Sequence, residues 1–426
     1  MLTFVFDVFL LCLTFLMLAY LARHYIFTLA VLIGERKHRR VSTFSLYQPT
    51  VSILIPARDE EHVIGRTLQR MTELTYPKEK LRIIVINDAS EDNTGSIAEH
   101  YAKKHDHIAV VHRNRTEGGR GKASALNAVF EQTRGEILLF FDADYYPQRD
   151  IVEKLTKEFA DEKTGAVQGR VTVLNEPYNL VTRLVALERI GGYRVDQQAR
   201  EKLNLIPQFG GTVGGVRRRL LEQLGGWDES ILAEDTDLTF RIRLLGYKVR
   251  YVIEAESYEE AVKDLKHYWK QRYRWAKGHM QCAFKHSLKV LRSDKLKPIE
   301  KIDGLLLLAI YFMPVLAMVS CIASFSLFLL KPPQSLFSLL WSAVPISLYS
   351  FTGNFAPFFE VGIGVYLDGR TRAVWLLSLL IFVFLYNILI CTKALVDLTT
   401  AKILGRNSNH WYKITHWGNG SDFVMN

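Results

Sequence analysis

One short apolar run, Val51-Ser52-Ile53-Leu54-Ile55-Pro56, opens the part of the sequence that decides the fold. Its length and β-branched composition are typical of a buried strand. Strand and helix patterns then alternate as far as residue 141. The expected strands cover 82–87, 108–112 and 136–141, and the expected helices cover 61–74, 94–104 and 122–132. Strands that alternate with helices predict an α/β domain built on a doubly wound, parallel sheet.

Outside this region the composition is uneven. The 426 residues are 49% hydrophobic and carry ten more positive than negative charges, yet the mean hydropathy is only +0.04. Apolar residues crowd into the first 34 positions and into 305–396, and charged residues fill the middle. This pattern excludes a disordered, collagen-like, disulfide-stapled or purely soluble protein. The four cysteines have no disulfide or zinc-site spacing, which favours a reducing compartment for the middle region.

The apolar ends predict membrane segments. The run at 2–21 lacks the preceding basic residues and the cleavage site of a secretory signal, so we expect an uncleaved anchor. The basic cluster at 36–40 predicts that the middle domain is cytoplasmic. A full span is expected at 305–330, two short or re-entrant segments at 335–367, and another span at 372–396. Together they predict three or four C-terminal crossings.

The sequence thus divides into five expected parts. They are a transmembrane anchor at 1–35, a cytosolic α/β domain at 36–260, amphipathic interfacial helices at 261–301, a transmembrane bundle at 302–398 and a polar tail at 399–426. The interfacial part is rich in Trp, Tyr and basic residues, which suit the headgroup region of a membrane.

Acidic residues follow three of the expected strands, as Asp59-Glu60, as Asp88 and as Asp142-Ala143-Asp144. Ligands of such sheets bind at the carboxyl ends of the strands. A single Asp in this place is more often a helix cap or turn former than a ligand. Two carboxylates one residue apart, however, suit a divalent cation that keeps positions open for phosphate oxygens.

Two glycine-rich segments allow two interpretations each. Gly118-Gly119-Arg120-Gly121-Lys122 precedes a helix, where backbone amides and a lysine could hold an anion, although a solvated turn fits equally well. It lacks the spacing of a Walker loop. The segment 209–215 fits either a close approach of backbone to a ligand or a tight hairpin.

Two further motifs lie nearer the C-terminus. Glu234, Asp235 and Asp237 precede a helix expected at 238–245, so one acid should cap it while another is available as a general base. Gln271, Arg274 and Trp275 have the spacing that places side chains on one face of a helix.

In this order the motifs resemble the membrane-integrated, inverting family 2 glycosyltransferases, the group of cellulose, hyaluronan, chitin-oligosaccharide and poly-N-acetylglucosamine synthases. The segment 55–61 and Asp88 are similar to the uridine-binding segments, and Lys122 with Ala125-Leu126-Asn127 is similar to the phosphate-side helix. Gln271-x-x-Arg274-Trp275 resembles the motif of processive members. The chain departs from the pattern at Asp59, where many members have Asn, and at Ala233, where polymer synthases often have Thr.

The resemblance implies a GT-A type fold and a role for each motif residue. The implied catalytic residues are Asp235, as the base, and Glu234. The implied UDP-binding residues are Pro56, Ala57, Glu60, Asp88, Lys122, Asp142 and Arg274. The implied acceptor-binding residues are Gly211, Thr212, Gln271 and Trp275, and the implied ligand of Mg²⁺ or Mn²⁺ is Asp144.

The implied function is processive, inverting β-glycosyl transfer from UDP-glucose or UDP-N-acetylglucosamine to a growing polysaccharide or oligosaccharide at the cytoplasmic face of the cell (inner) membrane, with export as a further expectation. One alternative is transfer of one or a few sugars to a lipid. Others are a nucleotide-binding membrane sensor without catalysis and a transporter. The expected partners are the UDP-sugar, a glycan or glycolipid acceptor, membrane lipid and a channel-forming subunit. Nucleic acid is not expected, because the bases gather beside membrane segments and phosphate-facing motifs.

Overall fold

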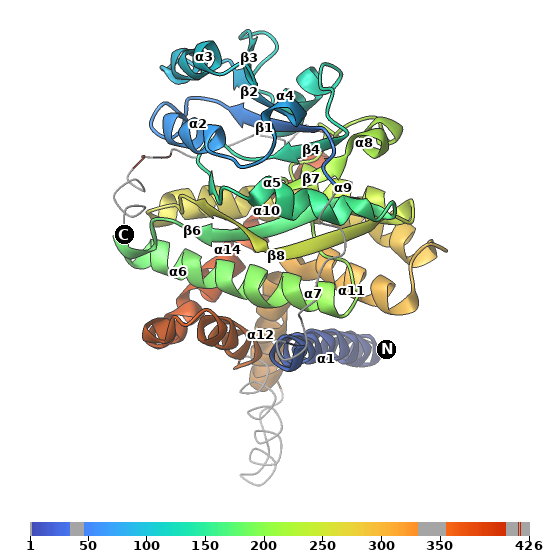
Figure 1. The fold of residues 1–426 in the computed structure, drawn as a ribbon. Helices are drawn as coiled ribbons and strands as arrows, with labels where there is room; N and C mark the ends of the chain where they lie inside the picture. Colours follow the sequence, from blue (N-terminus) through green and yellow to red (C-terminus); the bar gives the residue numbers. More distant parts are fainter. Residues whose placement is uncertain (1, 35–46, 331–354, 406–415, 417, 419–426) are drawn as a thin grey trace.

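The computed structural model describes residues 2–34, 47–330, 355–405, 416 and 418. An α/β domain forms one end of the molecule, and a layer containing α6 (Leu180–Arg189) and α7 (Gln198–Lys202) lies between its sheet and the apolar helices at the other end (Figure 1). The polar and apolar regions of the sequence therefore occupy different ends of the molecule.

The domain is built on one eight-stranded sheet in the order β3-β2-β1-β4-β7-β6-β8-β5. Its strands are β1 (Val51–Ala57), β2 (Leu81–Asp88), β3 (Ile108–Arg113), β4 (Ile137–Phe140), β5 (Tyr146–Pro147), β6 (Thr164–Val173), β7 (Gly214–Arg217) and β8 (Lys248–Glu259). The first four are parallel, as predicted, but β7 runs antiparallel to both β4 and β6. The α/β prediction is confirmed, whereas the sheet is mixed because the simple strand-helix alternation stops after β4.

The remaining helices of the domain cover both faces of the sheet. They are α2 (Ile64–Thr72), α3 (Thr94–Lys104), α4 (Lys122–Phe130), α5 (Ile151–Thr156), α8 (Arg218–Leu224) and α9 (Glu234–Leu244). The long helix α10 (Leu265–Arg292) packs against α9 and the apolar helices. A π-helix, η4 (Ile190–Gln197), joins α6 to α7. Short 3₁₀ turns are η1 (Lys78–Lys80), η2 (Lys157–Ala160), η3 (Glu176–Tyr178) and η5 (Ile310–Phe312).

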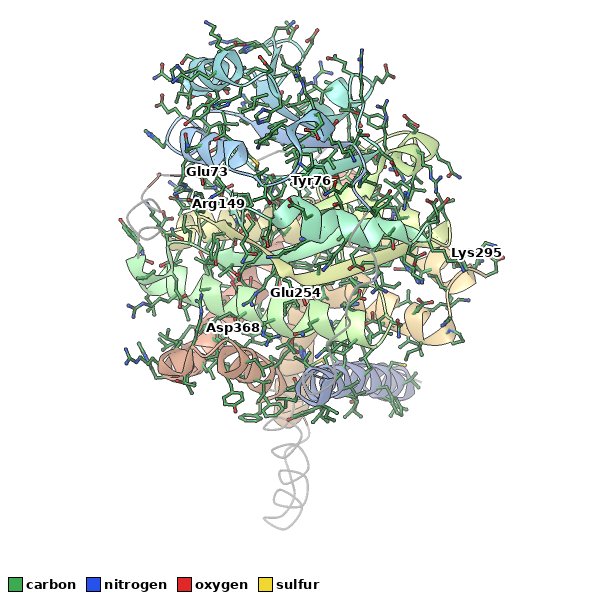
Figure 2. All side chains as sticks on the ribbon, viewed as in Figure 1. Glu73, Tyr76, Arg149, Glu254, Lys295 and Asp368 are labelled. Carbon is green, nitrogen blue, oxygen red and sulfur yellow. The ribbon has the colours of Figure 1, made fainter. Side chains whose placement is uncertain are left out.

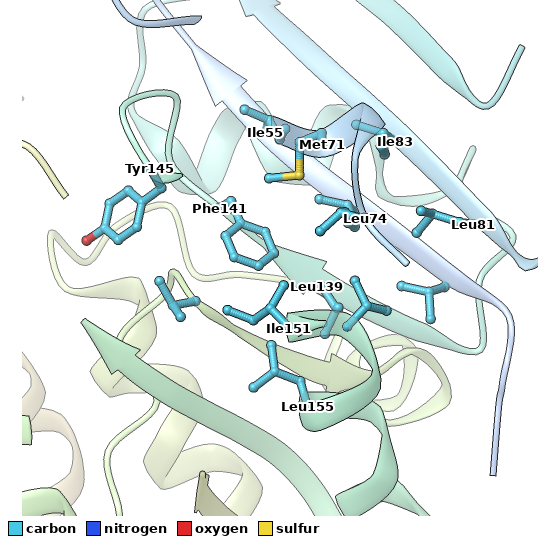
Figure 3. Packing of buried hydrophobic residues seen from close by; sticks show 14 of the residues in the cluster. Ile55, Met71, Leu74, Leu81, Ile83, Leu139, Phe141, Tyr145, Ile151 and Leu155 are labelled. Atoms are coloured by element: carbon cyan, nitrogen blue, oxygen red, sulfur yellow. The ribbon is translucent and has the colours of Figure 1, made fainter. Parts of the chain in front are cut away.

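A fully buried core fixes the sheet against α2 and α5. Ile55 of β1 and Leu139 of β4 pack with Met71 of α2 and with Ile151 and Leu155 of α5 (Figure 3). Neighbouring strand residues such as Leu54 and Leu138 point to the other face, where α4, α8 and α9 cover them. Burial of each such side chain contributes about 1.5–3 kcal/mol, so the strand ends that carry polar residues rest on a rigid base.

Three helical stretches in the described ranges are long and apolar enough to cross a membrane: Thr14–Ile33, Pro298–Val319 and Thr371–Ile403. They belong to α1 (Leu2–Gly34), to α11 (Pro298–Ala309) with η5 and α12 (Met313–Leu330), and to η6 (Thr371–Leu379) with α14 (Leu380–Ile403). A shorter apolar helix covers Phe355–Leu367. Part of the predicted 335–367 region lies outside the described residues, so the number of C-terminal crossings stays a prediction.

Buried ion pairs join the apolar helices to the domain. Arg23 of α1 pairs with Asp196 of η4, and Arg200 of α7 pairs with both Asp196 and Asp303 of α11. Asp368, which Figure 2 labels near the apolar helices, lies 3.0 Å from Arg194 Nε. These contacts fix η4 between the domain and the apolar helices.

Candidate active site

One cavity of about 770 Å³ brings the predicted site residues together. It extends from the carboxyl ends of β1, β2 and β4, past the start of α9 and one face of α10, to α11, α14 and the helix Phe355–Leu367. Within the described part of the chain, every residue predicted for the site lines this cavity except Gly211. Side chains predicted from separate motifs are thus neighbours in space.

At the end of the cavity formed by the carboxyl ends of β1 and β2, two hydrogen bonds hold the carboxylate of Asp88. Arg113 Nη1 donates to its Oδ1 at 2.6 Å, and the backbone amide of Gly119 donates to its Oδ2 at 3.1 Å. Gly119 and Gly121 both have positive φ, at 78° and 106°, so glycine is needed in this loop. The loop leads directly into α4 at Lys122, which places a helix start beside the cavity.

Lys122 and Asp142 form an ion pair in the cavity, and both side chains are partly exposed. Burial lowers the pKa of Lys122, but the carboxylates of Asp142 and Glu234 outweigh it and raise that pKa above its usual value. The backbone amide of Asp142 donates to Thr212 Oγ1 at 3.1 Å, which ties the glycine-rich segment to the end of β4. The positive charge of Lys122 therefore interacts both with Asp142, at the end of β4, and with Glu234, at the start of α9.

Asp144 is a buried carboxylate of the cavity with a strongly raised pKa. Burial raises its pKa to about 7, with Asp142 and Glu60 adding to the effect and His416 opposing it. Among the described residues, no three His, Cys, Asp or Glu side chains are placed to hold a metal ion by themselves. The oxygen donors of Asp142 and Asp144 nevertheless fit a hard divalent cation whose other positions are filled by phosphate oxygens.

The acidic motif lies inside the first turn of α9, not in front of it. The helix begins at Glu234. Its N-cap residue is Ala233, which makes no side-chain hydrogen bond to the first turn. The prediction that the helix covers 238–245 with one of the acids as its cap was therefore wrong. Carboxylates in a first turn are stabilised by the positive end of the helix dipole, which makes the cap unnecessary.

Glu234 and Asp235 share this buried turn and affect each other's ionisation. Burial and the neighbouring Asp235 raise the pKa of Glu234 to about 7, against the lowering effect of Lys122. Burial likewise raises the pKa of Asp235, although the backbone amide of Thr236 donates to Asp235 Oδ1 at 2.6 Å. A carboxylate whose pKa is raised toward neutrality is suited to accept a proton.

Gly211 packs against the side chain of Asp235 and is not one of the described residues that line the cavity. A Cβ on Gly211 would lie 3.1 Å from Asp235 Cβ, and its φ is 73°. The glycine is thus explained by close packing on Asp235, which differs from the predicted contact with an acceptor.

Gln271, Arg274 and Trp275 face the cavity from α10, in agreement with their predicted common face. Burial lowers the pKa of Arg274, and the carboxylates of Glu234, Asp142 and Asp235 oppose this. The guanidinium carbons of Arg272 and Arg189 lie 4.3 and 4.9 Å from the centre of the Trp275 ring. At least one face of the indole is therefore already covered by a cation.

His416 is a site residue that sequence reasoning missed. Its Nδ1 lies 2.9 Å from Glu60 Oε2, and its Nε2 lies 3.7 Å from Asp144 Oδ2. Burial lowers its pKa, but Asp144 and Glu60 outweigh this and raise it to about 10, so the imidazole is positively charged at neutral pH. A lone histidine 356 residues away from its partner leaves no pattern in the sequence.

Comparison with known proteins agrees with this geometry. Residues 49–278, more than half of the chain, match the model of the family described as "Glycosyltransferase like family 2". The chain belongs to this family of glycosyltransferases, which confirms the family indicated by the motifs.

Two curated relatives illustrate the likeness. The chain is 42% identical over 238 residues to the probable glycosyltransferase YdaM of Bacillus subtilis, covering 56% of this chain and 57% of that protein. It is 34% identical over 234 residues to the beta-monoglucosyldiacylglycerol synthase of Synechocystis sp., covering 55% of this chain and 48% of that protein. The chain thus spans about half the length of these relatives.

A solved structure supports the fold. The mannosyltransferase PcManGT from Pyrobaculum calidifontis, in complex with GDP-Man and Mn²⁺, has a TM-score of 0.58 and 25% identity, over 84% of this chain and 99% of that one. The predicted GT-A-like α/β domain is confirmed.

Proposed function

We propose that the protein is a membrane-anchored, inverting glycosyltransferase that transfers a sugar from a UDP-sugar to an acceptor hydroxyl at the cytoplasmic face of the cell membrane. The observation that carries this proposal is the single cavity that joins Asp88, Lys122, Asp144 and Asp235 to the apolar helices. A cavity of this kind supports the proposal because it has room for a nucleotide-sugar near Asp235 and continues to apolar helices that a membrane substrate could approach.

In this proposal the nucleotide occupies the loop-lined end of the cavity, near Pro56, Ala57, Glu60 and Asp88. Asp144, with Asp142 beside it, would hold Mg²⁺ or Mn²⁺, which supplies charge stabilisation for the diphosphate. The solved mannosyltransferase contains Mn²⁺ with its nucleotide-sugar, which supports a divalent ion here. Lys122 and Arg274 stabilise the negative charge that develops on the leaving UDP.

Asp235 is the proposed general base, because burial raises its pKa and hence its proton affinity, and Glu234 lies beside it in the first turn of α9. Asp235 takes the proton of the acceptor hydroxyl as that oxygen attacks the anomeric carbon from the side opposite UDP. Direct displacement of this kind inverts the anomeric centre, so an α-linked donor gives a β-linked product.

For the acceptor we propose a lipid that bears a hydroxyl group, with one or a few sugars transferred. Two observations support this choice: the cavity continues to the apolar helices, and a relative over half of the chain has the name beta-monoglucosyldiacylglycerol synthase. The second candidate is processive extension of a polysaccharide or oligosaccharide, coupled to export, alone or with a partner subunit. It is favoured by Gln271, Arg274 and Trp275, which line the cavity in the arrangement of the processive motif.

Product analysis separates these candidates. Purified full-length protein in proteoliposomes is incubated with Mn²⁺ and radiolabelled UDP-glucose or UDP-N-acetylglucosamine, and the label is divided into organic-soluble and high-mass fractions. We expect a labelled glycolipid from which a β-glycosidase releases the sugar. High-mass labelled material in place of glycolipid supports the processive candidate. Binding of UDP without any transfer contradicts both and favours a nucleotide sensor.

A further inference from the structure

The π-helix η4 forms one wall of the cavity between Asp235 and the apolar helices. Gly191, Gly192, Tyr193, Asp196 and Gln197, which all belong to η4, line the cavity. A π-helical turn is uncommon and is found mostly at functional sites. This segment is therefore the place to look for features that packing alone does not explain.

The two adjacent glycines of η4 have different surroundings. A Cβ on Gly191 would lie 2.9 Å from Val361 Cγ2, so close packing against the helix Phe355–Leu367 explains that glycine. A Cβ on Gly192 would meet no heavy atom of the described residues within 4 Å. Glycine inside a helix lowers the stability of the helix by about 1 kcal/mol relative to alanine. No neighbouring atom in the described chain requires glycine at position 192, so we attribute it to the cavity, where the missing side chain leaves space open.

The cavity that Gly192 lines has a group of apolar lining residues, here called the apolar wall, and a group of charged and polar ones. Leu307, Ile310 and Pro314 line it from α11, η5 and α12, and Phe384 and Cys391 line it from α14. Among the charged and polar lining residues, His24 contacts Glu360, and Arg23 forms an ion pair with Asp196. Asn387 of α14 also lines the cavity, and its Nδ2 donates to the Tyr268 hydroxyl at 3.0 Å.

This lining suits a hydrocarbon better than a sugar. Each hydroxyl of a buried sugar needs a hydrogen-bond partner, and an unpaired one costs roughly 1–3 kcal/mol. An apolar wall supplies no such partners, whereas alkyl chains lose nothing there and gain from leaving water. The wall also belongs to helices that are apolar enough to cross a membrane, so a lipid could reach it without passing through water.

We propose that the acceptor is an amphiphilic lipid whose hydrocarbon chain passes Gly192 and lies against the apolar wall, with its hydroxyl at Asp235. This inference rests on the proposed function. In the transfer, the lipid oxygen forms a bond to the anomeric carbon as the bond from that carbon to the UDP oxygen breaks. The bonding electron pair leaves with UDP, and the hydroxyl proton passes to Asp235. Gly192 then determines which acceptors fit.

The test narrows the passage and compares acceptors. Gly192→Leu and Gly192→Phe are prepared as full-length protein in proteoliposomes and assayed with UDP-glucose and UDP-N-acetylglucosamine, using dioleoylglycerol or cellotetraose as acceptor. We expect transfer to dioleoylglycerol to fall about tenfold or more, because a large side chain in place of Gly192 would occupy the open space through which the hydrocarbon chain is proposed to pass. Hydrolysis of the donor by water and binding of UDP should keep their wild-type values, because the substitution is on the acceptor side.

The matched control is Gly65→Ala on α2, where a Cβ makes an ordinary contact of 3.6 Å with Ile97. It should leave all three measurements unchanged. Unchanged transfer to dioleoylglycerol in both Gly192 variants overturns the inference, and so does an equal loss of transfer and donor hydrolysis. A wild-type protein that elongates cellotetraose but makes no lipid product also overturns it, while the proposed transferase stands. A wild-type protein that neither binds UDP nor releases it from either donor contradicts the proposed function itself.

Discussion

At the scale of single residues, the strand-end carboxylates were predictable and the tail histidine was not. Asp88, Asp142 and Asp144 follow strands whose pattern is clear, and parallel strands bring their carboxyl ends to one edge. His416 reaches the same place from 356 residues away. No periodicity encodes such a contact, because only the finished fold brings the two segments together.

The role of Asp235 can be tested by removing its ability to accept a proton. Asp235→Asn keeps the shape of the side chain and the contact with Gly211, so we expect UDP binding to persist. Transfer should fall about 10²–10⁴-fold, the usual contribution of a general base. Isothermal titration with UDP and a radiometric transfer assay measure the two effects. Loss of UDP affinity with transfer intact would sink the assignment.

The role of Asp144 can be tested through the metal ion. EDTA should abolish transfer, and Mn²⁺ or Mg²⁺ should restore it, because the diphosphate needs a cation to leave. Asp144→Asn should weaken Mn²⁺ binding as followed by electron paramagnetic resonance, whereas Asp161→Asn, an exposed control outside the cavity lining, should not. Full turnover in EDTA would remove Asp144 from this role.

At the scale of elements, the close contact between α9 and α10 decides the geometry of the proposed base. A Cβ on Gly278 of α10 would lie 2.5 Å from the backbone nitrogen of Ala233, directly before α9 begins. The two helices therefore approach at a position where only glycine fits. Asp235 and Arg274 face the same cavity because of this approach.

Gly278→Ala should push the start of α9 away from α10. We expect a loss of about 1–3 kcal/mol in the free energy of unfolding and a drop in transfer. Thermal unfolding in detergent and the transfer assay measure these effects. Gly65→Ala adds the same methyl group to a helix with room for it, so it should be neutral or slightly stabilising. Equal melting temperatures for the two variants would contradict the conclusion that only glycine fits where α10 approaches α9.

Sequence patterns predicted some of these elements correctly and missed others. The helix at 94–104 coincides with α3, because the residue pattern that predicts it is a local signal. The start of α9 was missed because Glu234 and Asp235 resemble a capping segment, although they lie within the helix. The strand β7 was missed altogether, since this short glycine-containing strand forms through long-range antiparallel pairing with β4 and β6.

At the scale of the whole molecule, we propose that the chain works as the five parts predicted from its composition. The apolar runs indicated the three candidate spans well, because length and hydropathy are sufficient for that purpose. The continuation of the cavity from β1 to α14 could not be predicted. It arises from side chains of several elements that meet only through tertiary packing.

The buried ion pair between Arg23 of α1 and Asp196 of η4 should hold the anchor to the domain. Arg23→Ala removes one of the two arginine partners of Asp196 while Arg200 remains, so we expect a loss of about 1–3 kcal/mol in the free energy of unfolding. A double-mutant cycle with Asp196→Ala, read by thermal unfolding in detergent, measures the coupling. The exposed pair Arg219–Glu162 is the control and should show a coupling of only about 0–1 kcal/mol. Similar coupling energies for the two pairs would contradict this role of α1.

The apolar wall of the cavity has a kinetic consequence. An acceptor that enters between the apolar helices arrives by lateral diffusion within one leaflet, in two dimensions. Its effective concentration is then its mole fraction among the surrounding lipids, and the volume of the aqueous phase has no influence on it. Dilution of the acceptor with inert lipid should slow such an enzyme, while dilution of the vesicles with buffer, at constant UDP-sugar concentration, should leave turnover per protein unchanged.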